Sequence, residues 1–201
     1  MSENEKHNEK MKRLQTSKQK IFAKKTEKKG LIIVNTGTGK GKSTAAFGMV
    51  FRGIAHGMPC AVVQFIKGAM ATGERDLIQQ HFSELCEFHT LGDGFTWNTQ
   101  DKEKDIASAK KAWCKAKELI SDENKKIILL DEINIALRYG YIEIDNVVSF
   151  LLEKKPEMTH VILTGRNANE KLIDIADLVT DMTLVKHQFR NGVMSQAGIE
   201  F

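Results

Sequence analysis

Proline and cysteine are scarce in this sequence, and long hydrophobic runs are missing from it. Of 201 residues only two are proline, which argues against proline-rich linkers. The three cysteines, Cys60, Cys86 and Cys114, show no CxxC or metal-ligand spacing, so we expect reduced thiols and no disulfide. No run of eighteen apolar residues occurs, and the N-terminal residues lack the apolar core of a signal peptide. We therefore expect a cytoplasmic protein with no membrane partner.

Positive charge is concentrated at one end of the chain. Residues 1–29 hold ten Lys or Arg against four Glu, a net charge of +6, whereas the whole chain has +4. Apolar positions are few between residues 4 and 28, which predicts a helix with a thin apolar stripe. We expect a basic helical arm at 1–29 and one domain at 30–201. A solvated arm is favoured over nucleic-acid binding, because Phe22 is the single aromatic residue there.

Short apolar runs separated by helical or loop sequence follow the arm. Such runs predict a mostly parallel sheet with helices on both faces, an α/β fold. The runs are LIIVN (31–35), CAVVQFI (60–66), IILLDE (127–132) and HVILT (160–164). An amphipathic helix is predicted over 101–121, with Trp113 in the core. Near the C-terminus, apolar segments flank Asn191-Gly192, which predicts a β-hairpin.

A glycine-rich loop, NTGTGKGKSTA at 35–45, lies between a predicted strand and a predicted helix. The Walker A pattern requires glycine at the position of Thr36, and the nearest glycine, Gly37, comes one place late. The rest of the pattern is intact, because Lys42 supplies a charge for phosphate and Ser43 a hydroxyl for magnesium. We predict a P-loop NTPase-like fold. The predicted ATP-binding residues are Thr36, Gly37, Thr38, Gly39, Lys40, Gly41, Lys42, Ser43 and Thr44, although Lys40 is equally compatible with a solvent-facing role.

Two further strand ends point to the same site. The IILLDE run has the form of a Walker B strand, so Asp131 and Glu132, with Ser43, are predicted to hold Mg²⁺; the alternative is that the two acids cap the next helix. Arg166, in the TGR sequence after the 160–164 strand, is predicted to reach phosphate, the alternative being a surface arginine. No set of residues typical of acid/base or nucleophilic catalysis is evident. His187 is left out of the site because a single histidine near a strand end is usually structural.

The motifs together resemble the P-loop branch of the ATP:corrinoid adenosyltransferase family. The resemblance covers nearly the whole chain from Gly30 onward. It rests on TGTGKGKSTAA (36–46), VVQFIKG (62–68), GE (73–74), GDGFTW (92–97), TQD (99–101), LLDEIN (129–134), LTGRNA (163–168), ADLVTDM (176–182), VKHQF (185–189) and QAGIEF (196–201). It implies transfer of the 5′-deoxyadenosyl group of ATP to Co(I) of a corrinoid, with release of triphosphate.

The resemblance also implies roles and partners. The altered glycine loop is shared by the family, which is similar in holding ATP reversed relative to ordinary P-loop enzymes. Lys42 would stabilise the departing triphosphate, while Phe95 and Trp97 would lie at the corrinoid and displace its lower axial ligand. The family implies a homodimer, an N-terminal helix over the corrinoid and an electron donor such as a reduced flavodoxin. The residues alone leave two alternatives open, an ATPase acting on nucleic acid and a small-molecule kinase. The preferred corrinoid is not predicted.

Overall fold

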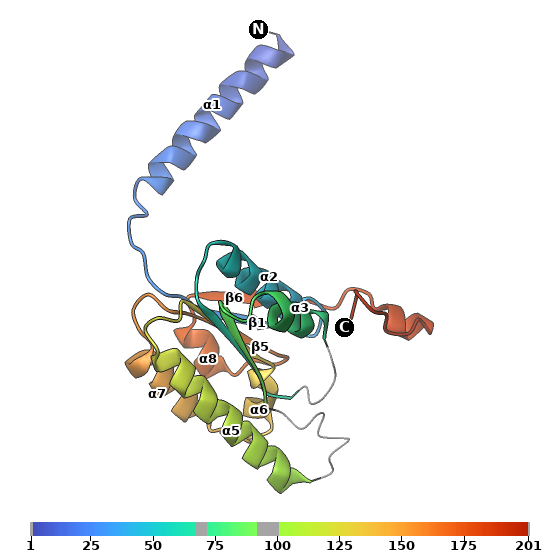
Figure 1. Ribbon diagram of the computed structural model, residues 1–201. Coiled ribbons are helices and arrows are strands. Elements are labelled where there is room, and N and C mark those ends of the chain that lie inside the picture. The colour runs from blue at the N-terminus through green and yellow to red at the C-terminus, as the bar shows by residue number, and fades with distance from the viewer. Residues whose placement is uncertain (1, 67–71, 92–100, 201) are drawn as a thin grey trace.

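A parallel β-sheet forms the centre of the computed structural model, which describes residues 2–66, 72–91 and 101–200 (Figure 1). The strands are β1 (Ile32–Thr36), β2 (Cys60–Gln64), β3 (Cys86–Thr90), β4 (Ile127–Asp131), β5 (His160–Thr164) and β6 (Leu178–Asp181). Their order is β3-β2-β4-β5-β1-β6, and every pairing is parallel. The helices are α1 (Glu3–Phe22), α2 (Lys42–Ala55), α3 (Gly73–His81), α5 (Lys102–Ser121), α6 (Ile133–Arg138), α7 (Ile144–Lys154) and α8 (Glu170–Ile175). The predicted α/β, P-loop NTPase-like fold is confirmed.

Helices cover both faces of this sheet, which is why its central strands are apolar on both sides. In β4, Ile128 and Leu130 pack into the core layer shared with α5 and α7, while Ile127 and Leu129 pack into the layer shared with α2. Trp113 of α5 is buried in the first layer, and its indole N–H donates to Asn146 Oδ1 at 2.9 Å. The prediction that Trp113 belongs to the core is confirmed.

The predicted C-terminal hairpin is wrong. After β6, the described residues form a 3₁₀ turn, η1 (Gln188–Asn191), in which Phe189 N–H donates to His187 Nδ1. Gly192, with φ 77°, ends this turn instead of connecting two strands. A hairpin needs a buried face to be stable, but Val185 and Met194 are 94% and 77% exposed. Gly192 therefore has the positive φ that a hairpin turn would need, but it lies at the end of a 3₁₀ turn.

Helix α1 lies apart from the sheet and contains no buried residue (Figure 1). A capping box starts it: Glu5 N–H donates to Ser2 Oγ, and Ser2 N–H donates to Glu5 Oε2. Its apolar side chains, Met11, Leu14 and Phe22 among them, are 44% to 70% exposed. Among the described helices, none has the length and apolarity needed to cross a membrane.

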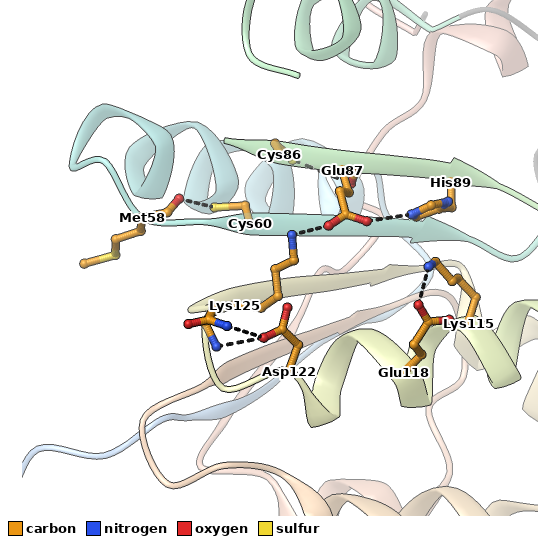
Figure 2. A network of polar contacts seen from close by, with 10 residues as sticks. Met58, Cys60, Cys86, Glu87, His89, Lys115, Glu118, Asp122 and Lys125 are labelled. Atoms are coloured by element: carbon orange, nitrogen blue, oxygen red, sulfur yellow. Dashed lines mark hydrogen bonds and ion pairs between the residues drawn. The ribbon is translucent and has the colours of Figure 1, made fainter. Parts of the chain in front are cut away.

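The edge strand β3 is protected by charge (Figure 2). The Glu87 carboxylate accepts a hydrogen bond from Lys125 Nζ and lies 3.3 Å from His89 Nε2. The hydrogen bond from Lys125 is the main reason why the pKa of Glu87 lies below its usual value. Charged side chains along an edge strand oppose pairing with a foreign strand.

All three cysteines are free thiols. Cys60 and Cys86 occupy paired positions on β2 and β3, and both are buried beneath α2 and α3. Burial raises the pKa of the Cys60 thiol to about 11 and that of Cys86 to about 12. Both thiols are therefore protonated and weakly nucleophilic at neutral pH.

His160 makes stability depend on pH. Its Nδ1 accepts a hydrogen bond from Leu31 N–H at 3.1 Å, and burial, aided by the charge of Lys155, lowers its pKa below the usual 6.5. Because the unfolded state takes up this proton more readily, the free energy of unfolding should fall as pH drops from about 6.5 towards the folded pKa. Urea unfolding at pH 7.5 and 5.5 measures the change. His160→Asn keeps an acceptor in place of Nδ1 and should reduce the pH dependence of the free energy of unfolding. The same pH dependence in this variant as in the wild type would contradict the role of His160.

Candidate active site

The glycine loop joins β1 to α2 and encloses Lys42. This side chain is 7% exposed, and its Nζ donates to the carbonyl oxygen of Gly39. Helix α2 begins at Lys42 with no side-chain cap and no acidic residue in its first turn. The positive end of a fourteen-residue helix is therefore directed at the loop, as in anion-binding sites.

The displaced glycine has a structural cause. Gly37 has φ 98°, a left-handed conformation, and a Cβ there would lie 2.3 Å from Asp181 Oδ1 and 2.6 Å from Met182 N. Gly39 N–H donates to Met182 O at 2.6 Å, so the chain after β6 lies directly against the loop. Thr36, where an ordinary Walker A loop has glycine, is the last residue of β1, and its hydroxyl accepts from Ala168 N–H. Glycine is needed at 37 because the end of β6 passes there.

Asp131 contacts the glycine loop through the Ser43 hydroxyl. It is fully buried, and its Oδ1 accepts hydrogen bonds from Ser43 Oγ at 2.7 Å and Thr164 Oγ1 at 2.8 Å. Its Oδ2 accepts from Gln64 Nε2 at 3.1 Å. Side chains from three other elements, α2, β5 and β2, thus fix one carboxylate of β4, which in turn orients the Ser43 hydroxyl. Gln64 belongs to the VVQFIKG motif but was not predicted as a site residue, because nothing local to that strand shows that its amide contacts Asp131.

The side chain of Glu132 is placed differently from that of Asp131. Its backbone is left-handed, with φ 63°, and its N–H donates to Thr164 Oγ1 at 2.9 Å. The side chain lines the cleft beside the loop, whereas Asp131 does not line it. Glu132 occupies the N-cap position of α6 without a side-chain capping hydrogen bond, so helix capping does not explain the acidic pair.

The TGR sequence reaches the same cleft through an unusual turn. Gly165 has φ 128°, and a Cβ there would lie 2.9 Å from Cβ of Asn134. The Asn134 amide donates to Gly165 O at 3.2 Å and holds the turn against α6. Arg166 then lines the cleft, and its side chain is exposed, so it is a surface arginine that lies beside the loop.

The cleft has a volume of about 470 Å³, within the range of small-molecule sites. The predicted residues that line it are Gly39, Lys40, Gly41, Lys42, Ser43, Thr44, Glu132 and Arg166. Thr36, Gly37, Thr38 and Asp131 do not line it. The lining also includes residues that the sequence did not single out as a site: Phe51, Gly73, Glu74, Leu77, Gly198, Ile199 and Glu200.

Charged side chains of both signs line this cleft: Lys40, Lys42 and Arg166, and the carboxylates Glu74, Glu132 and Glu200. Burial is the main cause that lowers the pKa of Lys42, and Arg166 and Lys40 lower it further. Glu132 and Asp181 act in the opposite direction. At the loop itself, Lys42 and the N-terminus of α2, which has no acidic residue in its first turn, favour an anionic ligand, whose charge would raise the pKa of Lys42 again.

Phe95 and Trp97 lie outside the described residues, so the structure gives no position for them. Within the described part of the chain, His, Cys, Asp and Glu form no group of three suited to a metal ion. The oxygen atoms near the loop instead belong to Ser43, to Asp131 at the end of β4, and to Glu132, the next residue. That donor set suits Mg²⁺, which binds few carboxylates and completes its coordination with water and phosphate oxygens.

Comparison with known proteins identifies the family. Residues 28–201 match the model of the ATP:corrinoid adenosyltransferase family BtuR/CobO/CobP. The chain belongs to the ATP:corrinoid adenosyltransferase family. It is therefore a transferase that adenosylates corrinoids in cobalamin biosynthesis or salvage.

Relatives in several bacteria share this family. A Sinorhizobium corrinoid adenosyltransferase is 67% identical over 195 residues, covering 97% of this chain and 91% of the relative. Those of Pseudomonas aeruginosa and Escherichia coli K12 are 45% and 41% identical, covering 98% and 94% of this chain and 96% of each relative. Membership in the adenosyltransferase family excludes the two alternatives, the nucleic-acid ATPase and the small-molecule kinase, as the main activity.

Proposed function

We propose that the cleft binds the triphosphate of MgATP while Co(I) of a reduced corrinoid attacks the ribose 5′ carbon. A cobalt–carbon bond forms with the electron pair of Co(I), the bond between C5′ and its oxygen breaks, and inorganic triphosphate leaves with that pair. The observation that carries the proposal is the convergence of Lys40, Lys42 and Arg166 on one cleft at the N-terminus of α2.

The protein residues in this reaction bind and neutralise. Lys42, Arg166 and the amides from Lys40 to Thr44 stabilise the negative charge that grows on the departing triphosphate. A Co(I) nucleophile carries no proton to be removed, which fits a site that consists of cations and hydrogen-bond donors. Lys42 is catalytic in this scheme because it contacts the leaving group, and Phe95 and Trp97 are catalytic because they contact the corrinoid.

Ser43 and Glu132 would hold Mg²⁺, with Asp131 orienting the Ser43 hydroxyl. When bound, the ion would supply charge neutralisation on the triphosphate. Support for this assignment comes from the hydrogen bond that Ser43 Oγ donates to Asp131 Oδ1, because it uses the hydroxyl proton and leaves the oxygen lone pairs for the ion. Glu132 is the carboxylate assigned to the ion because it lines the cleft, whereas Asp131 is fully buried.

Phe95 and Trp97 would form the apolar wall at the corrinoid. An apolar wall offers no donor to cobalt, so it would favour a four-coordinate Co(II) corrinoid that accepts an electron more easily. A reduced flavodoxin would supply that electron in the cytoplasm. These statements rest on the family resemblance of the GDGFTW sequence.

A homodimer is also proposed. Apolar side chains exposed after α8, such as Val179, Val185 and Phe189, offer a surface for a second copy. Analytical ultracentrifugation should give about twice the mass of the chain, and a monomer at micromolar concentration would contradict this.

The deciding experiment is an anaerobic incubation with chemically reduced cobalamin, Mg²⁺ and ATP. Loss of the Co(I) spectrum, a light-sensitive cobalt–carbon product and an equal amount of triphosphate are expected. Release of ADP and phosphate without a corrinoid product would overturn the proposal.

The arm 1–29 is proposed to lie over the bound corrinoid, because its exposed apolar stripe has no partner within the described chain. Deleting residues 1–28 should raise KM for cobalamin several-fold and leave the Kd for MgATP unchanged, since α1 does not line the cleft. Steady-state kinetics and calorimetry measure the two quantities. Unchanged corrinoid kinetics would contradict the proposal.

A further inference from the structure

The C-terminal segment returns to the phosphate loop at its last described residues. After β6 it leaves the sheet and doubles back near η1 (Figure 1). Gly198, Ile199 and Glu200 then line the same cleft as the loop. A turn holds these residues together, since the N–H groups of Ile199 and Glu200 both donate to Gln196 O.

Glu200 is fixed through both carboxylate oxygens. Oε2 forms an ion pair with Lys40 Nζ, and Oε1 accepts a hydrogen bond from Gln188 Nε2 in η1. The Glu200 side chain is 17% exposed, against 43% for Lys40. The hydrogen bond from Lys40 is the main cause that lowers the pKa of Glu200, so the carboxylate is ionised at neutral pH.

A carboxylate in this place opposes the ligand for which the cleft is suited. Lys40 is one of the three cations of the cleft, and Glu200 already neutralises it. A triphosphate that approaches Lys40 competes with Glu200 for the same ammonium group and is repelled by its charge.

We infer that Glu200 is a positioning residue that acts through Lys40: it takes Lys40 back from the triphosphate and so speeds release of the product. The inference rests on the proposed function, because it assumes that triphosphate occupies the cleft. It assigns the QAGIEF sequence a role in the binding of the leaving group. Sequence alone does not indicate this role, because Glu200 lies 160 residues from Lys40 along the chain.

The test measures binding of inorganic tripolyphosphate and MgATP to the full chain by calorimetry. Glu200→Gln should bind tripolyphosphate about two- to fivefold more tightly than the wild type, the range of a partly exposed ion pair. The inhibition constant for triphosphate as product should fall by the same factor. Glu200→Asp, which keeps the charge, should stay close to the wild type.

A double-mutant cycle separates this role from a purely structural one. In a Lys40→Met background, Glu200→Gln should tighten tripolyphosphate binding by a clearly smaller factor than in the wild-type background, because the cation for which the two anions compete has been removed and only direct repulsion is left. Glu153→Gln, an exposed position on α7, controls for the change in net charge. Circular dichroism checks that each variant is folded.

Two results would overturn the inference: unchanged or weaker binding in Glu200→Gln, or a gain in affinity that is equally large without Lys40. A failure of the proposed function looks different. It would appear as ADP in the product analysis, whereas the calorimetric comparison concerns the affinity for tripolyphosphate alone.

Discussion

Replacing Lys42 with methionine is expected to lower kcat/KM for ATP by roughly a hundredfold or more. Lys42 is the most buried cation of the cleft, so its charge acts on the triphosphate with little screening by water. Methionine keeps most of the length and the apolar stem of the side chain but removes the charge. Initial rates of cobalt–carbon bond formation under anaerobic conditions, at several ATP concentrations, measure the loss.

The same substitution should leave the ATP-free protein at least as stable as the wild type. Burial lowers the pKa of Lys42, so the folded state disfavours the charged form. The free-energy cost of burying the charged ammonium group is therefore present in full below the folded pKa. It declines only as pH rises through the folded pKa of Lys42 towards 10.5, the usual value. Urea unfolding of wild type and Lys42→Met measures the difference.

Lys111→Met is the matched control, because Lys111 is an exposed lysine on α5, away from the cleft. It should change neither activity nor stability appreciably. A Lys42→Met enzyme with activity within tenfold of the wild type would remove Lys42 from the catalytic role. A marked loss of stability would mean that its bond to Gly39 O matters more than its desolvation.

The inner strands were predictable from sequence, and the edge strands were not. β1, β2, β4 and β5 are buried on both faces and appear as continuous apolar runs, as the physics of parallel sheets requires. β3 is half-buried and contains Glu87 and His89, and β6 is exposed along its length. Neither gives an apolar run, so neither was predicted.

The site divides in a similar way. The glycine loop, the β4 acids and Arg166 each follow a buried strand. The local sequence pattern therefore predicts that all three lie at the same edge of the sheet. The different placements of Asp131 and Glu132 depend on a left-handed backbone at residue 132, which no local pattern indicates. The pairing of Lys40 with Glu200 depends on where a long C-terminal segment folds, and the sequence predicted a hairpin there.

Gly37→Ala is expected to lower the free energy of unfolding by about 2 kcal/mol or more and to weaken MgATP binding at least tenfold. Alanine disfavours φ 98°, and its Cβ would lie 2.6 Å from the backbone of Met182, which cannot rotate aside as a side chain does. Relief requires the chain after β6 to move, and that chain accepts the hydrogen bond of Gly39 N–H. Urea unfolding and calorimetry with MgATP measure the two effects.

Gly48→Ala supplies the control, because Gly48 lies within α2 and a Cβ there meets nothing within 4 Å. It should stabilise the protein by about 0.5–1 kcal/mol, the helix preference of alanine over glycine. The sharper comparison is the double variant Thr36→Gly/Gly37→Ala, which restores the usual Walker A spacing. It should not recover ATP binding, since the clash with Met182 remains and the Thr36 hydroxyl no longer accepts from Ala168 N–H. Recovery would instead mean that the loop tolerates glycine at either position and that β6 does not determine where the glycine must be.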